Sequence, residues 1–176
     1  INYRGKKTYE VFGRGLGSYT AKKNLLLDFG NSGTAARILT SILSTTPNIN
    51  IKLTGDKSLK KRSMQKLIIL MNQFGAEFFP KNKFFFPLRI QSSNYPIGIQ
   101  YKAGTSAQLK SAVMLAGLNS YGNTEIIESF KSRDHTENML KNNFRAIKIK
   151  YKKTKSIRIV GKQSIERFLI NVPGDP

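Results

Sequence analysis

The chain has 176 residues, with 30 Lys and Arg against 10 Asp and Glu, and so carries a formal net charge of +20 at pH 7. It is long enough to bury the core of an ordinary domain, and its lack of cysteine excludes a disulfide framework and thiolate chemistry. No apolar run approaches the roughly 18 residues of a membrane span and no signal-peptide pattern opens the sequence, so we expect a cytoplasmic protein without a membrane partner.

The excess of basic residues raises nucleic acid as a partner, because phosphate backbones attract cations. The basic residues are, however, spread through every segment, without a dense arm or a patch interleaved with aromatic side chains. We interpret most of them as solvated surface residues, with a basic cleft for small anions as the first alternative and nucleic acid as the last. The scattered set includes Lys6, Lys22, Lys60, Lys81, Lys110, Lys131, Lys150 and Lys162.

Apolar residues in the first half of the chain alternate in some segments, as in a strand, and recur every three or four residues in others, as in a helix. The second helix is expected to stop at Phe74-Gly75, since glycine favours the left-handed conformation that ends many helices. In order, we predict a strand at 7–12, a helix at 33–45, a strand at 49–53, a helix at 62–73, and strands at 76–79 and 84–90 joined by a turn at 80–83.

The second half repeats this order, which predicts an α/β protein with an internal repeat of β-α-β-α-β-β units. Gly33-Thr34 pairs with Gly104-Thr105 at an offset of 71 residues, and Phe74-Gly75-Ala76 pairs with Phe144-Arg145-Ala146 at an offset of 70. The predicted elements are a strand at 97–102, a helix from 104 to 118, a strand at 124–127, a helix at 132–140, a hairpin of 147–151 with 157–160, and a closing strand at 168–172.

The stretch Asn31-Ser32-Gly33-Thr34 opens the first helix with small polar residues. Such a start leaves backbone N–H groups free at the positive end of the helix dipole, which suits a phosphate or carboxylate, although the same residues also cap helices that bind nothing. Right-handed crossovers should place the helix starts of both units on one side. We therefore expect the starts near Asn31, Ser58, Thr105 and Ser132 to converge on one rim as a polyanion site.

Individual side chains support an anion at this rim. Arg37, Arg62 and Arg133 fall in the first turns of predicted helices, where a cation is repelled by the dipole unless an anion compensates it or the side chain reaches into solvent. Ser106 and Gln108 add a hydroxyl and an amide that can read a polyhydroxylated ligand.

The lone histidine, His135, could serve as a general base. It lies at a predicted helix start beside Asp134 and Glu137, which are equally available, and we interpret it as structural. The chain has no Cys/His cluster, and we expect no metal site.

Five ordered motifs run across nearly the whole chain: Gly30-Asn31-Ser32-Gly33-Thr34, Gly55-Asp56-Lys57-Ser58-Leu59-Lys60-Lys61-Arg62, Ser106-Ala107-Gln108-Leu109-Lys110-Ser111-Ala112, Ser132-Arg133-Asp134-His135-Thr136-Glu137 and Val172-Pro173-Gly174-Asp175. Together they resemble the 5-enolpyruvylshikimate-3-phosphate synthases. The resemblance implies the enolpyruvyl transferase fold, an inside-out α/β barrel of repeated βαβαββ units, in one domain of a two-domain protein. We then expect most of the N-terminal domain, with an incomplete first unit, repeats at about 20–92 and 93–162, and a crossover near 172.

The resemblance also implies an activity of the shikimate pathway, which leads to chorismate and the aromatic amino acids. The enolpyruvyl group of phosphoenolpyruvate is joined to the 5-hydroxyl of shikimate 3-phosphate and phosphate leaves, without a cofactor. Carried over by motif, Asn31, Gly33, Thr34, Arg62 and Gln108 would bind phosphoenolpyruvate, and Ser106, Ala107, Gln108 and Arg133 would bind shikimate 3-phosphate.

The family's Lys-Ser-x-Ser-x-Arg segment is expected before Ile1, and its catalytic Asp, Glu and Lys after Pro176, so no catalytic residue is assigned here and the chain alone is expected to be inactive. Ser63 stands where the family usually has Pro, and Arg145 where it usually has Gly. The alternatives are a related enolpyruvyl transferase acting on a UDP-sugar and a basic RNA-binding module. The parent protein is expected to be a monomer that binds these small anions and no nucleic acid.

Overall fold

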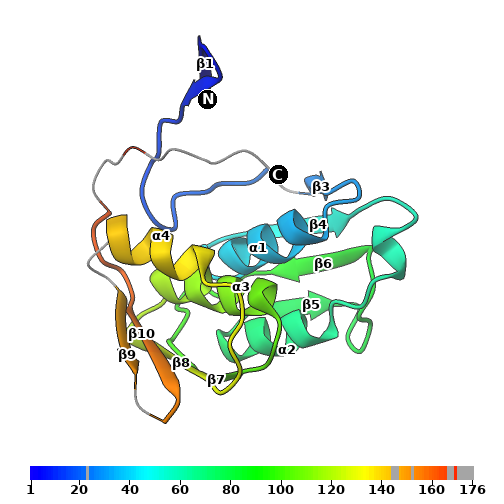
Figure 1. Ribbon diagram of the computed structural model, residues 1–176. Coiled ribbons are helices and arrows are strands. Elements are labelled where there is room, and N and C mark those ends of the chain that lie inside the picture. Colours follow the sequence, from blue (N-terminus) through cyan, green and yellow to red (C-terminus); the bar gives the residue numbers. More distant parts are fainter. Residues whose placement is uncertain (23, 144–146, 152, 166–168, 170–176) are drawn as a thin grey trace.

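In the computed structural model, residues 1–22, 24–143, 147–151, 153–165 and 169 are described. They form two four-stranded sheets with helices packed against them and a small N-terminal hairpin that projects from the rest of the molecule (Figure 1). The hairpin pairs β1 (Asn2–Gly5) with β2 (Thr8–Glu10), and the rings of Tyr3 and Tyr9 contact each other across it. The strand predicted at 7–12 is thus present as β2, in a shorter form.

The first sheet and its helices form one β-α-β-α-β-β unit. Its strand order is β3-β4-β6-β5, with β3 parallel to β4 and the remaining pairs antiparallel. The elements are β3 (Leu26–Asp28), α1 (Gly33–Ser44), β4 (Asn50–Thr54), the 3-10 helix η1 (Leu59–Lys61), α2 (Gln65–Gln73), β5 (Glu77–Phe79) and β6 (Leu88–Gln91).

The second sheet repeats this topology in the order β7-β8-β10-β9, again with one parallel pair, β7 with β8. Its elements are β7 (Gln100–Ala103), α3 (Ala107–Leu118), β8 (Asn123–Glu128), α4 (His135–Asn143), β9 (Ile147–Tyr151) and β10 (Lys155–Val160). The predicted α/β class and the repeated βαβαββ order are confirmed. Apart from residue 169, which is described and is not in a strand, the predicted strand at 168–172 lies outside the described residues, as do the crossover near 172 and the pairing of Phe74 with Phe144.

The central helices α1 and α3 lie side by side and carry most of the contact between the two units, with a smaller contribution from α2 against α3 (Figure 1). α3 is buried on most of its surface, as its apolar sequence requires. The described core is built from residues of both units: Phe29, Ala36, Ile49, Ile51, Leu53, Leu59, Met64, Leu67, Ile68, Leu70, Met71, Phe74, Ala76, Phe78, Phe86, Leu88, Ile90, Ala103, Leu109, Ala112, Val113, Met114, Ala116, Leu118, Ile126, Leu140, Ile147, Ile157 and Ile159.

The two central helices are related by an offset of 74 residues, and the predicted offset of 71 is wrong at this point. Ser32 and Ser106 cap α1 and α3 in nearly the same conformation, with φ of −81° for both. Residues 74 apart also touch: Gln108 donates to Thr34 at the helix starts, and Asn119 donates to the Thr45 carbonyl at the helix ends. Equivalent positions meet at both ends, so α1 and α3 run parallel and in register.

The caps explain the error in the offset. Gly33-Thr34 are the first residues of α1, whereas Gly104-Thr105 precede the cap of α3. A glycine followed by a threonine does not define a helix start. The start is set by the N-cap serine, whose side chain accepts a hydrogen bond from a backbone N–H of the first turn.

Two further predicted helix starts are displaced. The helix predicted at 62–73 begins at Gln65, and Ser58 precedes only the three residues of η1 without a side-chain cap. The helix predicted from Ser132 begins at His135. Residues 84–87 are not a strand, since Pro87 has no N–H to donate to a neighbouring strand. The C-cap at Phe74 with a left-handed Gly75 (φ +93°) is confirmed. None of the described helices has the length and apolar character needed to cross a membrane.

Candidate anion-binding site

The loops that follow β3 and β4 are held together at one end of the first sheet. The Asp56 N–H donates to the Gly30 carbonyl at 2.9 Å, and the Asp28 carboxylate accepts from the Gly30 N–H at 2.9 Å. Gly55 is required at this contact, because a Cβ there would lie 2.4 Å from Leu59 Cδ2 and 2.9 Å from the Gly30 oxygen. The start of α1 and the Ser58–Arg62 segment are thereby placed side by side.

Arg62 reaches from the second loop to the first. Its Nη2 donates to Asn31 Oδ1 at 3.0 Å and to Ser58 Oγ at 3.3 Å. Arg62 is exposed and has extended backbone angles (φ −89°, ψ 127°), so the prediction that it lies in the first turn of a helix is wrong. Its approach to α1 comes from the bend between η1 and α2.

A second guanidinium lies at the same helix start. Arg37 Nη1 donates to the Gly33 carbonyl at 3.0 Å. A Cβ at position 33 would lie 3.0 Å from Arg37 Nη1 and 3.1 Å from Arg62 Nη1. Glycine therefore leaves room for both arginines beside the first turn of α1.

The two arginines make this helix start strongly positive. Burial, and then the charge of Arg62, lower the pKa of Arg37 from its ordinary value. Among the described residues neither arginine forms an ion pair, and the Asp28 and Asp56 carboxylates of these loops accept backbone N–H groups. Two uncompensated cations at the positive end of a helix form a site suited to an anion.

The start of α3 adjoins that of α1. Gln108 Nε2 donates to Thr34 Oγ1 at 2.8 Å, which joins a predicted site residue of each unit. Ser106 Oγ accepts from the Leu109 N–H at 3.3 Å as the helix cap, and Ala107 is the first residue of the helix. The structure thus brings Asn31, Gly33, Thr34, Arg62 and Gln108 together, with Ser106 and Ala107 in the turn next to them.

Arg133 is the predicted site residue that this set does not include. It is exposed and lies between β8 and α4, before the helix rather than in its first turn, and it forms no hydrogen bond or ion pair with the described part of the chain. The start of α4 is linked to α3 through Ser111 Oγ and Thr136 Oγ1, which are 2.8 Å apart. His135 is the exposed first residue of α4.

A buried ion cluster of Lys110, Glu128, Glu137 and Lys155 lies behind this loop, and sequence reasoning missed it. Lys110 Nζ is 2.7 Å from Glu128 Oε1 and also pairs with Glu137. Lys155 Nζ is 3.3 Å from Glu128 Oε2 and likewise pairs with Glu137. The interpretation of Lys110 as a solvated surface residue is wrong, since its side chain is 1% exposed. A lone lysine inside the apolar sequence of α3 is the signal that could have indicated a buried partner.

Charge pairing shifts the pKa of two members of the cluster, Glu128 and Lys155. Burial by itself would raise the pKa of Glu128, but hydrogen bonds from Lys110 and Ser132 and the Lys110 charge lower it to about 2. Burial would lower the pKa of Lys155, but the Glu137 and Glu128 carboxylates raise it above its ordinary value. With two lysines and two glutamates, the cluster is neutral overall, and it leaves no charge for a ligand.

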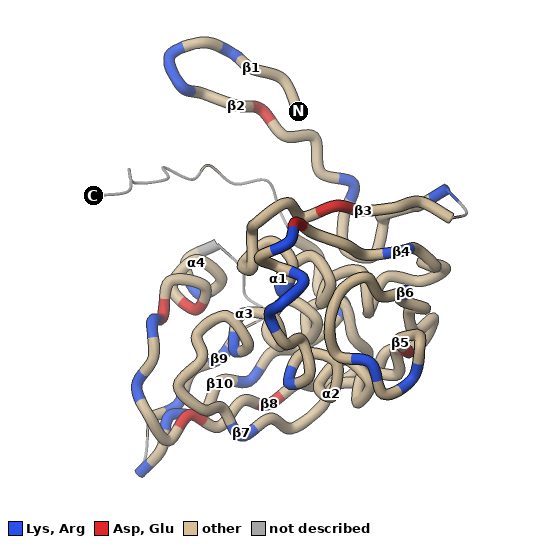
Figure 2. Tube along the Cα trace, turned by 90° about the vertical axis from the view of Figure 1, so that its right-hand side faces the viewer, with Lys and Arg blue, Asp and Glu red and all other residues tan. Residues whose placement is uncertain are grey.

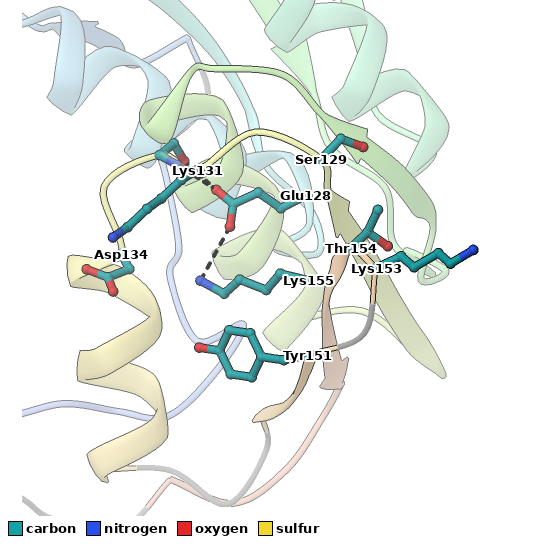
Figure 3. Close-up of a pocket in the computed structure, with 9 residues that line it drawn as sticks. Glu128, Ser129, Lys131, Asp134, Tyr151, Lys153, Thr154 and Lys155 are labelled. Atoms are coloured by element: carbon teal, nitrogen blue, oxygen red, sulfur yellow. Dashed lines mark hydrogen bonds and ion pairs between the residues drawn. The ribbon is translucent and has the colours of Figure 1, made fainter.

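A cavity of about 440 Å³ opens beside the cluster (Figure 3). The ion pair of Glu128 with Lys155 lines it, and Tyr151 lies next to Lys155. Elsewhere, lysines and arginines are distributed over the whole trace rather than gathered on one face (Figure 2). In the described residues, no group of three or more His, Asp or Glu side chains could hold a metal ion.

Comparison with known proteins places these motifs in one family. The sequence matches EPSP synthase (3-phosphoshikimate 1-carboxyvinyltransferase) over residues 2–176. It is 36% identical to the 3-phosphoshikimate 1-carboxyvinyltransferase of Paramagnetospirillum magneticum over 100% of this chain and 40% of that protein. It is 39% identical to that of Aquifex aeolicus over 98% of this chain and 40% of that protein. The chain therefore spans about 40% of the length of these curated relatives.

Solved structures give the same picture. EPSP synthase from Acinetobacter baumannii superposes with a TM-score of 0.70 at 35% identity, covering 82% of this chain and 32% of that chain. The enolpyruvyl transferase NikO from Streptomyces tendae has a TM-score of 0.51 at 14% identity over 75% of this chain and 31% of that chain, a likeness of fold alone.

Proposed function

This chain belongs to the EPSP synthase family, and on that premise we propose that it forms part of the substrate cleft of an enzyme that joins phosphoenolpyruvate to shikimate 3-phosphate. In the proposed reaction the 5-hydroxyl oxygen of shikimate 3-phosphate adds to the enol carbon of phosphoenolpyruvate while a proton adds to the methylene carbon. The hydroxyl proton leaves as this carbon–oxygen bond forms, and loss of phosphate and of a proton from the methyl group of the resulting tetrahedral intermediate then restores the double bond, which gives the enol ether product.

One observation carries this proposal. Arg62, Gln108 and the pair Asn31 and Thr34 come from three separate motifs, and two hydrogen bonds join them at the adjacent starts of α1 and α3. The arginines beside Gly33 have no carboxylate partner within the described chain. A small ligand with a phosphate and a carboxylate supplies the negative charge that this arrangement lacks.

We assign phosphoenolpyruvate to the α1 side, where Arg62 is free to pair with an anion and Gly33 keeps the helix start open. The α3 side, with Ser106, Ala107 and Gln108, is assigned to shikimate 3-phosphate, because hydroxyl, amide and backbone N–H groups suit a polyhydroxylated ring. Gln108 donates to Thr34 and so stands between the two assigned positions. Arg133 is assigned to shikimate 3-phosphate from the loop before α4.

The proton transfers need a general acid and a general base close to the reacting carbon. The carboxylates near the assigned residues are engaged: Asp28 and Asp56 accept backbone N–H groups, and Glu128 and Glu137 pair with buried lysines. We therefore propose that these 176 residues bind substrate weakly and do not turn over alone. We further propose that the complete enzyme is a cytoplasmic monomer that binds neither nucleic acid nor membrane.

Calorimetric titration of the full-length protein with shikimate 3-phosphate tests the proposal, with release of phosphate on addition of phosphoenolpyruvate as the second readout. We expect saturable binding followed by turnover. Absence of binding by a folded protein would overturn the assignment. Tight RNA binding that weakens steeply with salt would instead favour a nucleic-acid role for the +20 charge.

A further inference from the structure

The carboxylate of Glu128 holds the loop that carries Arg133. Glu128 is the last residue of β8 and is 4% exposed. Its Oε1 accepts from the Ser132 N–H at 3.0 Å, from Ser132 Oγ at 2.7 Å and from Lys110 Nζ at 2.7 Å. One oxygen atom thus links Ser132, in the loop before α4, to the buried side chain of Lys110 on α3.

The same carboxylate is fixed from its other side. Lys155 of β10 approaches Glu128 Oε2 at 3.3 Å, as Figure 3 shows. Lys110 and Lys155 both pair with Glu137 of α4 as well. Because charge-assisted bonds reach it from α3 and β10, Glu128 has little freedom to move and is a rigid anchor for Ser132.

The loop itself has few other attachments. Residues 129–134 are in neither a helix nor a strand, and Ser129, Phe130, Lys131 and Arg133 are exposed. Segments with few buried contacts sample many conformations unless specific bonds restrain them. The two bonds from Ser132 to Glu128 act on the residue directly before Arg133 in the chain.

The helix α3 connects this anchor to the candidate site. Gln108, which contacts Thr34, precedes Lys110 by two residues, and Ser111 contacts Thr136 of α4. The start of α3 and the loop before α4 are therefore held by neighbouring residues of a single buried helix.

We infer that Glu128 is a positioning residue: held by Lys110 and Lys155, it sets the Ser132–Arg133 segment so that the Arg133 guanidinium meets shikimate 3-phosphate at the start of α3. This inference rests on the proposed function and on the assignment of Arg133. If Glu128 positions Arg133, the ion cluster affects the affinity for shikimate 3-phosphate as well as the stability of the fold.

The test is made in the full-length enzyme with Ser132→Ala, which removes the hydroxyl tether and leaves the ion cluster in place. We expect KM for shikimate 3-phosphate to rise roughly 5-fold to 10-fold, with kcat, KM for phosphoenolpyruvate and the melting temperature nearly unchanged. Ser132→Thr keeps the hydroxyl, so its KM for shikimate 3-phosphate should equal that of the unmodified enzyme. Ser156→Ala is the matched control, because it removes a serine–glutamate hydrogen bond, 2.9 Å to Glu125, elsewhere on the same sheet.

A second comparison separates positioning from direct contact. In an Arg133→Ala background, Ser132→Ala should have no further effect on KM for shikimate 3-phosphate, since Ser132 is inferred to act through Arg133. A full additional effect would mean that Ser132 contacts the substrate itself, and an unchanged KM in the single variant would mean that the tether does not matter. Either result overturns the inference. Failure of the proposed function is distinguishable, because the unmodified enzyme would then not use shikimate 3-phosphate at all.

Discussion

The two units have equivalent strand orders but differ in how their basic residues are paired. The first unit comprises β3 to β6 with α1 and α2, and the second comprises β7 to β10 with α3 and α4. In the first unit, Arg37 and Arg62 lie at the start of α1 without a carboxylate partner in the described chain. In the second, Lys110 and Lys155 are paired with Glu128 and Glu137 behind the start of α4.

This difference separates two uses of basic residues that composition cannot tell apart. The paired lysines satisfy charges inside the fold, so their removal should change stability. The arginines at α1 neutralise no carboxylate within the described chain, so their removal should change ligand binding. Four experiments test that contrast.

The largest effect is expected for Lys110→Met. The change leaves Glu128 and Glu137 buried without their shared counter-charge, which should lower the free energy of unfolding by about 3–5 kcal/mol. Urea unfolding of the full-length protein measures it, with Lys102→Met on the exposed surface of β7 as control. A loss as small as that of the control would contradict a structural role for the cluster.

Acid should weaken the second unit through Glu128. Its pKa is about 2 in the folded chain against an ordinary value of 4.5, so the carboxylate contributes stability that is complete above pH 4.5 and is lost as pH falls from 4.5 towards 2. The shift corresponds to about 3 kcal/mol. Unfolding free energies measured between pH 6 and 3 test this, and Glu128→Gln should flatten the dependence. An equally steep profile in that variant would assign the effect to other carboxylates.

Lys155 gives the complementary result at high pH. Because its pKa is raised by the two glutamates, its contribution is complete below the unfolded value of 10.5 and is lost only as pH rises through the higher folded value.

Arg62→Ala should act on the ligand and leave the fold intact. Loss of its charged hydrogen bonds is expected to reduce kcat/KM for phosphoenolpyruvate ~30-fold to 150-fold, which corresponds to about 2–3 kcal/mol of transition-state stabilisation, with little change in unfolding free energy. Steady-state kinetics measures it against Arg158→Ala, an exposed arginine on β10. If Arg62→Ala behaved like Arg158→Ala, the anion site would have to lie elsewhere.

The smallest effect is expected for Gly33→Ala. The added methyl group would lie about 3 Å from the ends of both guanidiniums, which are flexible and can move aside. We expect KM for phosphoenolpyruvate to rise about 5-fold, or about 1 kcal/mol, while the melting temperature stays the same or increases, because alanine favours a helix. A marked loss of stability would show instead that the arginines are rigidly held by the fold.

Much of the fold could be predicted from local patterns. The helix predicted at 33–45 is α1, and the predicted hairpin of 147–151 with 157–160 is β9 with β10. These elements have regular apolar spacing and clear stop signals, which depend on neighbours in sequence. The starts at Ser58 and Ser132 were wrong because a serine is equally suited to other bonds, and Ser132 in fact bonds to Glu128.

The candidate site was predictable in its residue types and not in its contacts. The motifs identified Asn31, Thr34, Arg62 and Gln108. The hydrogen bond from Gln108 to Thr34 joins residues 74 apart in the sequence, one in each unit. The spacing of apolar residues within a single unit could not predict it. The offset of 71 drawn from Gly-Thr pairs would have matched Thr34 with Thr105 instead.

The α/β class, the order of the elements, the repeat and the family could all be predicted from the amino-acid sequence, since these follow from side-chain spacing and from motifs read in order. Which of the many basic residues are neutralised depends instead on how the chain packs in three dimensions. Lys110 lies 18 residues from Glu128 in the sequence. The two side chains meet because α3 packs against β8, the strand whose last residue is Glu128. Whether a charge faces solvent, a ligand or another charge is a property of packing, because the energy of a charge depends on what surrounds it.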